Sequence, residues 1–169
     1  FRLIQTEAED IIKNKRPQPS TKTTIQQQSV RLNILVAEDN IVNQRIMQKL
    51  LSKLGHSMSI VDNGKSALDL IKTGINFDLI LMDMMMPIMS GIETTIAIRH
   101  WESQKNKINS LHIIAMTANA GEEDRKQCLE AGMDDFISKP ILKEALKQKL
   151  VEVSKIQLRS VWNSKSDRA

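Results

Sequence analysis

The sequence predicts an α/β domain with a doubly wound parallel sheet of five strands. Two observations predict this fold: five short apolar runs recur along residues 33–138, and an amphipathic stretch of helical length follows each of them. Parallel strands need crossover connections, so five such units place helices on both faces of one sheet. The expected strands are residues 34–37, 58–61, 79–82, 113–116 and 136–138.

The first and last expected helices each carry one apolar face. In the first helix the apolar residues recur at every fourth position: Val42, Ile46, Leu50 and Leu54. Gly55 follows at the position where glycine ends many helices. In the last helix the apolar residues are Leu142, Ala145, Leu146, Leu150 and Val153. Both stretches are therefore expected to be amphipathic helices.

The domain is expected to cover residues 31–154, between an upstream segment with a linker at 1–30 and a C-terminal tail at 155–169. Residues 13–30 are rich in Pro, Ser, Thr and Gln and have few large apolar side chains to offset the entropy lost on ordering. The preceding segment FRLIQTEAEDII is either a short helix or the end of a preceding domain. The second alternative implies a longer parent chain.

The net charge of +4 belongs to the two ends of the chain. Residues 1–30 carry five Lys/Arg and three Asp/Glu, and residues 154–169 carry four and one, whereas residues 31–153 carry fifteen and sixteen. A basic face for nucleic acid is not expected, because the central part is slightly acidic and the chain has no Tyr.

Cysteine content and hydropathy favour a cytoplasmic setting. Cys128 is the only cysteine, which excludes an intrachain disulfide and a multi-cysteine zinc site. No run of eighteen apolar residues and no apolar signal stretch occurs, so direct membrane insertion is not expected. A membrane-anchored parent remains compatible with these features.

Polar side chains follow four of the five apolar runs. Glu38 and Asp39 follow the first run, Asp83 the third, Thr117 the fourth and Lys139 the fifth. Ligands of such sheets bind beyond the carboxyl ends of the strands, where the winding direction reverses. The sequence therefore predicts that three carboxylates, one hydroxyl and one ammonium converge at one edge of the sheet.

This set of side chains suits a hard cation and phosphoryl transfer. Crowded carboxylates repel one another unless a cation is present, and oxygen ligands favour Mg²⁺, or Mn²⁺ in its place. Phosphoryl transfer needs in-line geometry and positive charge facing the phosphoryl oxygens. Asp83 can then be the nucleophile, Lys139 a fixed positive charge, and Thr117 a hydroxyl donor to a phosphoryl oxygen.

Each residue also has a simpler interpretation. Asp83 alone could be a turn former, Asp39 a helix N-cap, Lys139 an exposed lysine before a proline, and Thr117 a strand-end hydroxyl. The methionines at 82, 84, 85, 86 and 89 could form a soft Cu(I) site, although packing is the preferred interpretation. The joint occurrence of the polar positions favours the phosphoryl-transfer site.

Four segments resemble those of response-regulator receiver domains, in the form found at the C-terminus of hybrid histidine kinases. They are ILVAEDNIVNQ, DLILMDMMMPIMSG, IIAMTA and DDFISKP, and the resemblance covers residues 32–153. It implies a flavodoxin-like (βα)5 receiver fold with strand order 2-1-3-4-5. It also implies a two-component phosphorelay, in which Asp83 is the phosphoacceptor for a phosphohistidine.

The same resemblance implies the metal ligands. Asp39 and Asp83 would bind Mg²⁺ directly, Glu38 would bind it through water, and Met85 would contribute its backbone carbonyl.

The resemblance further implies a cis peptide between Lys139 and Pro140, which aims the lysine at the phosphoacceptor. Thr117 and Phe136 would be the switch residues that move on phosphorylation.

Three other functions compete with this one. The first is a degenerate receiver that acts only as a binding module. The second is an aspartate-nucleophile phosphatase, which would need an acid two residues after Asp83, where Met85 stands instead. The third is a flavodoxin-like cofactor binder, which would need a glycine-rich phosphate loop that the sequence lacks.

The expected partners are a histidine kinase module in the same parent chain and a histidine phosphotransfer protein. A receiver promotes its own phosphorylation and dephosphorylation but is not a turnover enzyme by itself. The partner surface is expected around the active-site edge and the first helix, because a donor histidine must come in line with Asp83. Ile41 and Pro140 are the candidate exposed apolar residues there.

Overall fold

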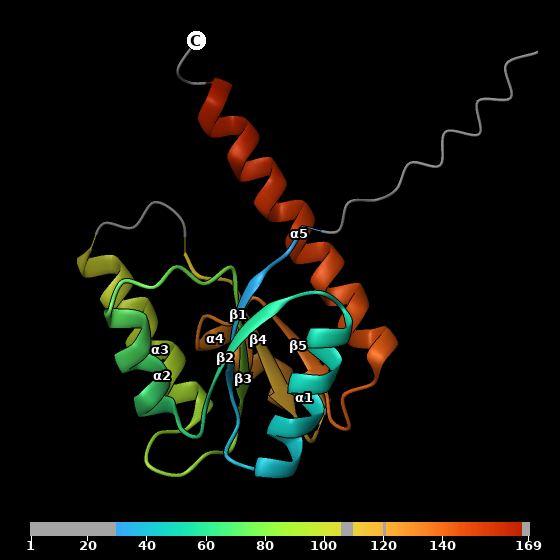
Figure 1. Cartoon of the computed structure of the whole chain (residues 1–169). Helices are drawn as coiled ribbons and strands as arrows, with labels where there is room; N and C mark the ends of the chain where they lie inside the picture. The colour runs from blue at the N-terminus through green and yellow to red at the C-terminus, as the bar shows by residue number, and fades with distance from the viewer. Residues whose placement is uncertain (1–29, 106–109, 120, 167–169) are drawn as a thin grey trace, which may run out of the picture.

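The computed structural model describes residues 30–105, 110–119 and 121–166, with side chains as far as Arg159. The expected upstream segment and linker lie outside these residues, apart from Val30. In the described part, five strands alternate with five helices (Figure 1). The strands are β1 (Asn33–Ala37), β2 (Ser57–Val61), β3 (Leu79–Asp83), β4 (Ile113–Thr117) and β5 (Asp135–Ser138). The helices are α1 (Ile41–Lys53), α2 (Gly64–Lys72), α3 (Gly91–Gln104), α4 (Glu122–Glu130) and α5 (Lys143–Ser166).

The strands form one parallel sheet in the order β2-β1-β3-β4-β5, which confirms the predicted fold. The winding direction reverses between β1 and β3, because the chain goes from β1 outward to β2 and then returns to the other side of β1. Ala37 and Met82 are paired in register at the carboxyl ends of these two strands. Glu38 follows Ala37 and Asp83 follows Met82, so these two acidic residues stand next to each other at the edge where ligands of such sheets bind.

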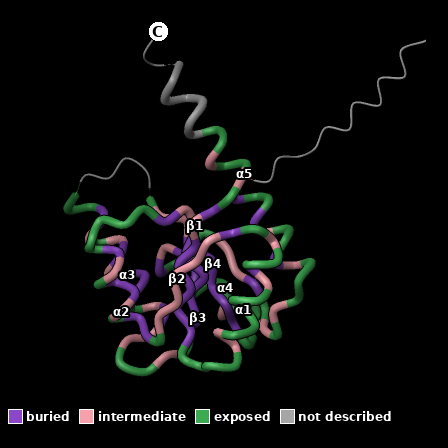
Figure 2. Tube along the Cα trace, in the orientation of Figure 1, coloured by how far each residue is buried: buried purple, intermediate pink, exposed green. Residues whose placement is uncertain are grey.

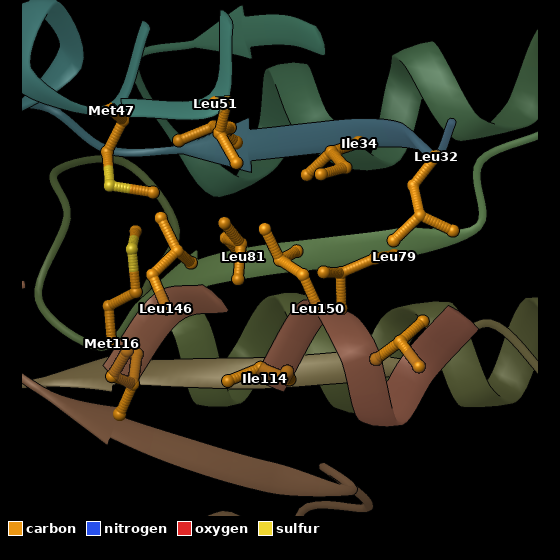
Figure 3. Close-up of a cluster of buried hydrophobic side chains, with 13 residues drawn as sticks. Leu32, Ile34, Met47, Leu51, Leu79, Leu81, Ile114, Met116, Leu146 and Leu150 are labelled. Atoms are coloured by element: carbon orange, nitrogen blue, oxygen red, sulfur yellow. The ribbon is translucent and has the colours of Figure 1, made fainter. Parts of the chain in front are cut away.

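Helices cover both faces of the sheet (Figures 1 and 2). On one face, side chains of β1, β3 and β4 point toward those of α1 and α5 (Figure 3). On the other face, α2, α3 and α4 pack against the remaining strand side chains. The three central strands are buried on both faces, which explains their continuous apolar runs. Each fully buried Leu or Ile contributes about 1.5–3 kcal/mol to this packing.

Helix α1 does not bury the apolar line that the sequence suggested. Its fully buried side chains are Met47 and Leu51, whereas Val42 is 59% and Ile46 is 45% exposed. Residues four apart are rotated by about 40° around a helix, so the first and last positions of the line differ by about 120°. The sheet therefore contacts only the later part of that line, and its N-terminal part faces solvent.

Helix α5 differs from the expectation at both ends. Leu142 lies before its first residue and is 65% exposed, so the helical spacing does not apply to it. Leu146, Leu150 and Val153 are buried as expected. The helix then continues to Ser166, through most of the segment expected to be a C-terminal tail, and extends beyond the sheet (Figure 1). None of the helices in the described part of the chain has the length and apolar content needed to cross a membrane.

Candidate functional site

Three carboxylates meet at the carboxyl edge of the sheet. Glu38 and Asp39 follow β1, and Asp83 is the last residue of β3. One oxygen atom from each of the three lies within 4.8 Å of the others. Glu38 and Asp83 are 1% and 4% exposed, whereas Asp39 faces solvent. The structure thus brings together the three acidic residues that the sequence singled out.

Lys139 connects two of these carboxylates. Its Nζ atom lies 2.7 Å from Asp83 Oδ2 and 2.7 Å from Glu38 Oε2. The backbone N–H of Lys139 donates to the carbonyl of Thr117 at 2.7 Å, which fixes the start of the loop after β5 to the end of β4. The peptide between Lys139 and Pro140 is cis. The ammonium therefore lies beside the acidic cluster and is not an ordinary exposed lysine head group.

Burial and charge act on the ion pair in opposite directions. Burial raises the pKa of Asp83, Lys139 lowers it through its hydrogen bond, and the nearby Glu38 raises it again, with a net shift upward. Burial alone would lower the pKa of Lys139, but its hydrogen bonds to Asp83 and Glu38 outweigh burial and raise it. The upward shift in the pKa of Lys139 decides the protonation state of the pair, since two carboxylates contact one ammonium. Lys139 is charged at neutral pH.

The first turn of α1 holds Glu38 from the other side. Asn40 is the N-cap, and its Oδ1 accepts from Val42 N at 2.9 Å and from Asn43 N at 3.3 Å. Asp39 is thus not the cap, so the capping interpretation of that residue is wrong. Asn43 Nδ2 donates to Glu38 Oε1 at 2.9 Å. Gln44 Nε2 donates to the Glu38 carbonyl at 2.6 Å.

Sequence reasoning missed Asn43 and Gln44 as neighbours of the site. The signal was present in the segment EDNIVNQ, where two amide residues stand three and four positions after the capping Asn40. At that spacing they share the side of the first turn that faces back toward the end of β1.

The loop after β3 is closed tightly over Asp83. Asp83 Oδ1 accepts from Met85 N at 3.3 Å, so the turn-forming role proposed for this aspartate coexists with its ion pair. Gly91 N donates to the Met84 carbonyl at 3.1 Å. A Cβ atom on Gly91 would lie 2.3 Å from the Asp83 carbonyl oxygen, so only glycine allows this approach.

Thr117 and Phe136 occupy the neighbouring strands. Thr117 is buried at the end of β4, and its hydroxyl donates to the Asn119 carbonyl at 2.7 Å. Phe136 is half-buried on β5, and the Arg125 guanidinium lies 5.4 Å from the centre of its ring. Each side chain therefore has a local partner that it would have to leave in order to move.

The donor set fits a hard divalent cation. It consists of carboxylate oxygens, one of them solvent-exposed, and Mg²⁺ prefers such ligands together with water. Most of the methionines have a packing role: Met82 is in the core, Met84, Met86 and Met89 pack partly against it, and Met85 is 80% exposed.

Comparisons with known proteins agree with this fold. The model of the response regulator receiver domain family matches residues 34–151. The hybrid signal transduction histidine kinase I of Dictyostelium discoideum is 44% identical over 118 residues, which are 68% of this chain. The chain spans only 7% of the length of that relative.

Two solved structures are similar over three-quarters of the chain. One is the receiver domain of the response regulator Ssk1 of Saccharomyces cerevisiae, solved with the histidine phosphotransfer protein Ypd1. It has a TM-score of 0.70 and 34% identity, and the match covers 75% of this chain and 91% of that one. The other is the receiver domain of the sensor histidine kinase PA1611 of Pseudomonas aeruginosa, with a magnesium ion in its active-site cleft. It has a TM-score of 0.65 and 35% identity, and the match covers 75% and 99% of the two chains.

Proposed function

The chain belongs to the response regulator receiver domain family, and we propose that it accepts a phosphoryl group from a phosphohistidine onto Asp83 in a Mg²⁺-dependent reaction. One observation carries the proposal: a buried aspartate at the end of β3 is paired with an ammonium and lies within 4.8 Å of two more carboxylates. Such a site offers a nucleophile and positive charge at one point, which is what phosphoryl transfer requires.

The reaction forms one bond and breaks one. An oxygen of the Asp83 carboxylate attacks phosphorus, and the bond between phosphorus and the donor imidazole nitrogen breaks. The electron pair of that bond stays on the imidazole nitrogen, and the product is an acyl phosphate. No base is needed to activate Asp83, because a carboxylate is the nucleophilic form already.

Mg²⁺ would be held by Asp39 and Asp83 directly, by Glu38 through water, and by the backbone carbonyl of Met85. When bound, the ion supplies positive charge opposite the phosphoryl oxygens. The acidic cluster and the magnesium ion in the cleft of the PA1611 receiver support this assignment. Mn²⁺ has similar ligand preferences and would replace it.

Lys139 would neutralise a phosphoryl oxygen after the transfer. Its ammonium already contacts Asp83, so it would need little movement to follow the new negative charge. Thr117 would exchange its hydrogen bond with the Asn119 carbonyl for one with a phosphoryl oxygen. Phe136 would then turn inward, away from Arg125, and alter the face formed by α4 and β5.

The parent would be a hybrid histidine kinase, with a kinase module in the same chain as this receiver. The likeness to the Dictyostelium hybrid kinase supports this proposal. The receiver would work in the cytoplasm and pass its phosphoryl group to a histidine phosphotransfer protein. The complex between the similar Ssk1 receiver and Ypd1 supports that class of partner.

The partner would dock on an apolar surface beside Asp83. Helix α1 exposes Ile41 and Val42 at 58% and 59%, and Ile46 at 45%. Ile88, in the loop after β3, is 82% exposed, and Pro140 is exposed as well. The helix and loops that carry these residues begin at the edge that holds Asp83, so a partner protein seated on them would bring its histidine to the acidic cluster.

Incubation with acetyl phosphate and Mg²⁺ tests the proposal. We expect the intact mass to increase by one phosphoryl group, and hydroxylamine to remove the adduct as it does other acyl phosphates. EDTA and the Asp83→Asn variant should each abolish the adduct. A chain that takes no phosphoryl group from acetyl phosphate or from a panel of phosphohistidine proteins would instead be a degenerate receiver that only binds its partner.

A further inference from the structure

We propose that Asn43 is a positioning residue for the metal site. Its side-chain amide holds the Glu38 carboxylate in the orientation in which Glu38 serves a divalent cation while it also contacts Lys139. The inference rests on the proposed function, because that function assigns Glu38 to Mg²⁺. Asn43 itself is not proposed as a ligand.

The two oxygens of Glu38 have different donors. Oε2 accepts from Lys139 Nζ at 2.7 Å, and Oε1 accepts from Asn43 Nδ2 at 2.9 Å and from Asn40 N at 3.3 Å. The side chain is 1% exposed, so water does not replace these donors easily. Without Asn43, the strongest remaining donor is Lys139, and both oxygens could turn toward its ammonium. Asn43 therefore keeps Oε1 of Glu38 from turning toward the Lys139 ammonium.

The charge of the donor explains why an amide stands at this position. Counted by formal charge, three carboxylates and one ammonium give the cluster of Glu38, Asp39, Asp83 and Lys139 a net charge of −2. That charge matches a divalent cation. A Lys or Arg in place of Asn43 would also satisfy Oε1, but it would reduce the net charge and repel the ion. A neutral amide orients the carboxylate without this cost.

The backbone of Asn43 is held in place by the N-cap of α1. Its N–H donates to Oδ1 of the capping residue Asn40, in the first turn of α1. Its side chain reaches back from this turn to the carboxylate of Glu38, which follows β1.

A purely structural role would give a different result. If Asn43 only satisfied a buried carboxylate, its loss would lower stability and leave the affinity for Mg²⁺ unchanged. If it positions Glu38, the affinity itself must fall. Loss of a residue that orients a metal ligand typically weakens binding by about 10- to 100-fold. Since Glu38 would act through water, we expect the low end of this range, about tenfold.

Titration calorimetry of the 169-residue chain with Mg²⁺ separates the two roles. The variants are Asn43→Ala and, as the matched control, Gln48→Ala, which removes an exposed amide from the next turn of the same helix. We expect Kd to rise about tenfold for Asn43→Ala and to stay at the wild-type value for Gln48→Ala. Phosphorylation by acetyl phosphate should need correspondingly more Mg²⁺, but reach the wild-type rate at saturation, because the reacting groups are intact.

The outcomes distinguish this inference from the proposed function. If the wild-type chain binds Mg²⁺ and Asn43→Ala binds it equally well, the positioning role is refuted and the proposed function stands. If the wild-type chain binds no Mg²⁺, the proposed function is refuted, and the positioning role that rests on it is refuted as well. Should Asn43→Ala be partly unfolded without metal, the rise of its urea midpoint with Mg²⁺ concentration reports the same Kd by linkage.

Discussion

Lys139 reaches from the end of β5 past β4 to Asp83 at the end of β3, where its Nζ atom lies 2.7 Å from Asp83 Oδ2. The same atom lies 2.7 Å from Glu38, which follows β1. One ammonium thus connects three strands of the sheet at the edge where their carboxyl ends meet. It balances carboxylates that would otherwise repel one another, and it stands where a phosphoryl group on Asp83 would carry its charge.

Replacement of Lys139 by Met should impair both stability and reactivity. Met keeps the apolar stem but removes the charge, so Glu38 and Asp83 would face each other without a cation. Loss of one partner from a buried ion pair costs about 3–5 kcal/mol. Because the lysine side chain is 21% exposed, we expect a loss of about 2 kcal/mol in the free energy of unfolding without Mg²⁺.

The phosphorylation rate of Lys139→Met with acetyl phosphate should fall about 100-fold, as when a donor to a developing negative charge is removed. Urea unfolding and intact mass against time measure the two effects. Lys65→Met is the control, because Lys65 forms an exposed ion pair with Asp69, and it should change stability by less than about 0.5 kcal/mol. Equal stability and rate for Lys139→Met and wild type would disprove the role of Lys139.

The strand ends and the acidic cluster could be predicted from the sequence because both depend on local pattern. An apolar run followed by a polar residue marks the end of a buried strand. The expected strands differ from β1–β5 by at most one residue at either end. Parallel pairing then places such ends at one edge of the sheet, whatever the details of packing. Asp83 and Lys139, which are 56 positions apart, meet for this reason.

Details that depend on packing could not be predicted from the sequence. Which side of α1 faces the sheet is decided by contacts with the strands, and they select Met47 and Leu51 instead of Val42 and Ile46. Helix α5 continues past Val153 without the buried apolar spacing of its earlier turns: Ile156 is 50% and Leu158 is 56% exposed. The bond between Asn43 and Glu38 depends on where the cap of α1 lies, and a shift by one residue would remove it.

Replacement of Gly91 by Ala should distort the loop that holds Asp83. The added Cβ atom would meet the Asp83 carbonyl oxygen at 2.3 Å and Met84 Cα at 3.0 Å. Since both neighbours are backbone atoms, they cannot move aside without moving the phosphoacceptor. We expect a loss of about 3 kcal/mol in the free energy of unfolding, at the upper end for overpacking. The phosphorylation rate should fall as well.

Gly121→Ala is the control for this substitution. Gly121 is the N-cap of α4, and the nearest atom to an added Cβ would be Asp124 Oδ2 at 3.6 Å. A smaller loss of about 1 kcal/mol is expected there, because Ala is a poorer N-cap than Gly. If Gly91→Ala were as mild as Gly121→Ala in urea unfolding, the close approach of the loop to Asp83 would be refuted.

His56 should make the stability of the domain depend on pH. Burial lowers the pKa of His56, and its Nδ1 accepts a hydrogen bond from Leu32 N at 3.2 Å, so the folded chain holds the neutral ring. The unfolded chain takes up a proton near pH 6.5, before the folded chain does. The contribution of the neutral His56 ring to the free energy of unfolding is therefore complete above about pH 6.5. It is lost as the pH falls below this value.

Urea unfolding between pH 7.5 and pH 5.5 checks this expectation. The free energy of unfolding should decline less over this range in His56→Gln than in wild type. His100→Gln, at an exposed position of α3, should keep the wild-type decline. An equal decline in wild type and His56→Gln would show that His56 is not responsible.

Replacement of Ile46 by Ala should slow transfer from a protein donor without affecting the chemistry. Ile46 lies on the exposed apolar part of α1, at 45% exposure. Truncation of a residue that dominates an interface costs about 1 kcal/mol or more, so we expect transfer from a phosphorylated histidine phosphotransfer protein to slow about fivefold. The rate with acetyl phosphate should stay unchanged.

Ile75→Ala is a matched control for Ile46→Ala. Ile75 is 46% exposed, but it precedes β3 and so lies toward the opposite edge of the sheet. Its loss should affect neither donor. Equal transfer rates for Ile46→Ala and Ile75→Ala would exclude α1 from the docking surface.

Transfer from a phosphohistidine, followed residue by residue, tests the central claim most directly. The chain is mixed with a phosphorylated histidine phosphotransfer protein and Mg²⁺, quenched at short times, reduced with borohydride to trap acyl phosphates, and mapped by peptide mass spectrometry. We predict that the product of this reduction, which is the label, appears at Asp83 as the phosphohistidine disappears. No residue should carry this label in Asp83→Asn. Loss of phosphohistidine with Asp83 unlabelled, or label at another carboxylate, would contradict the account.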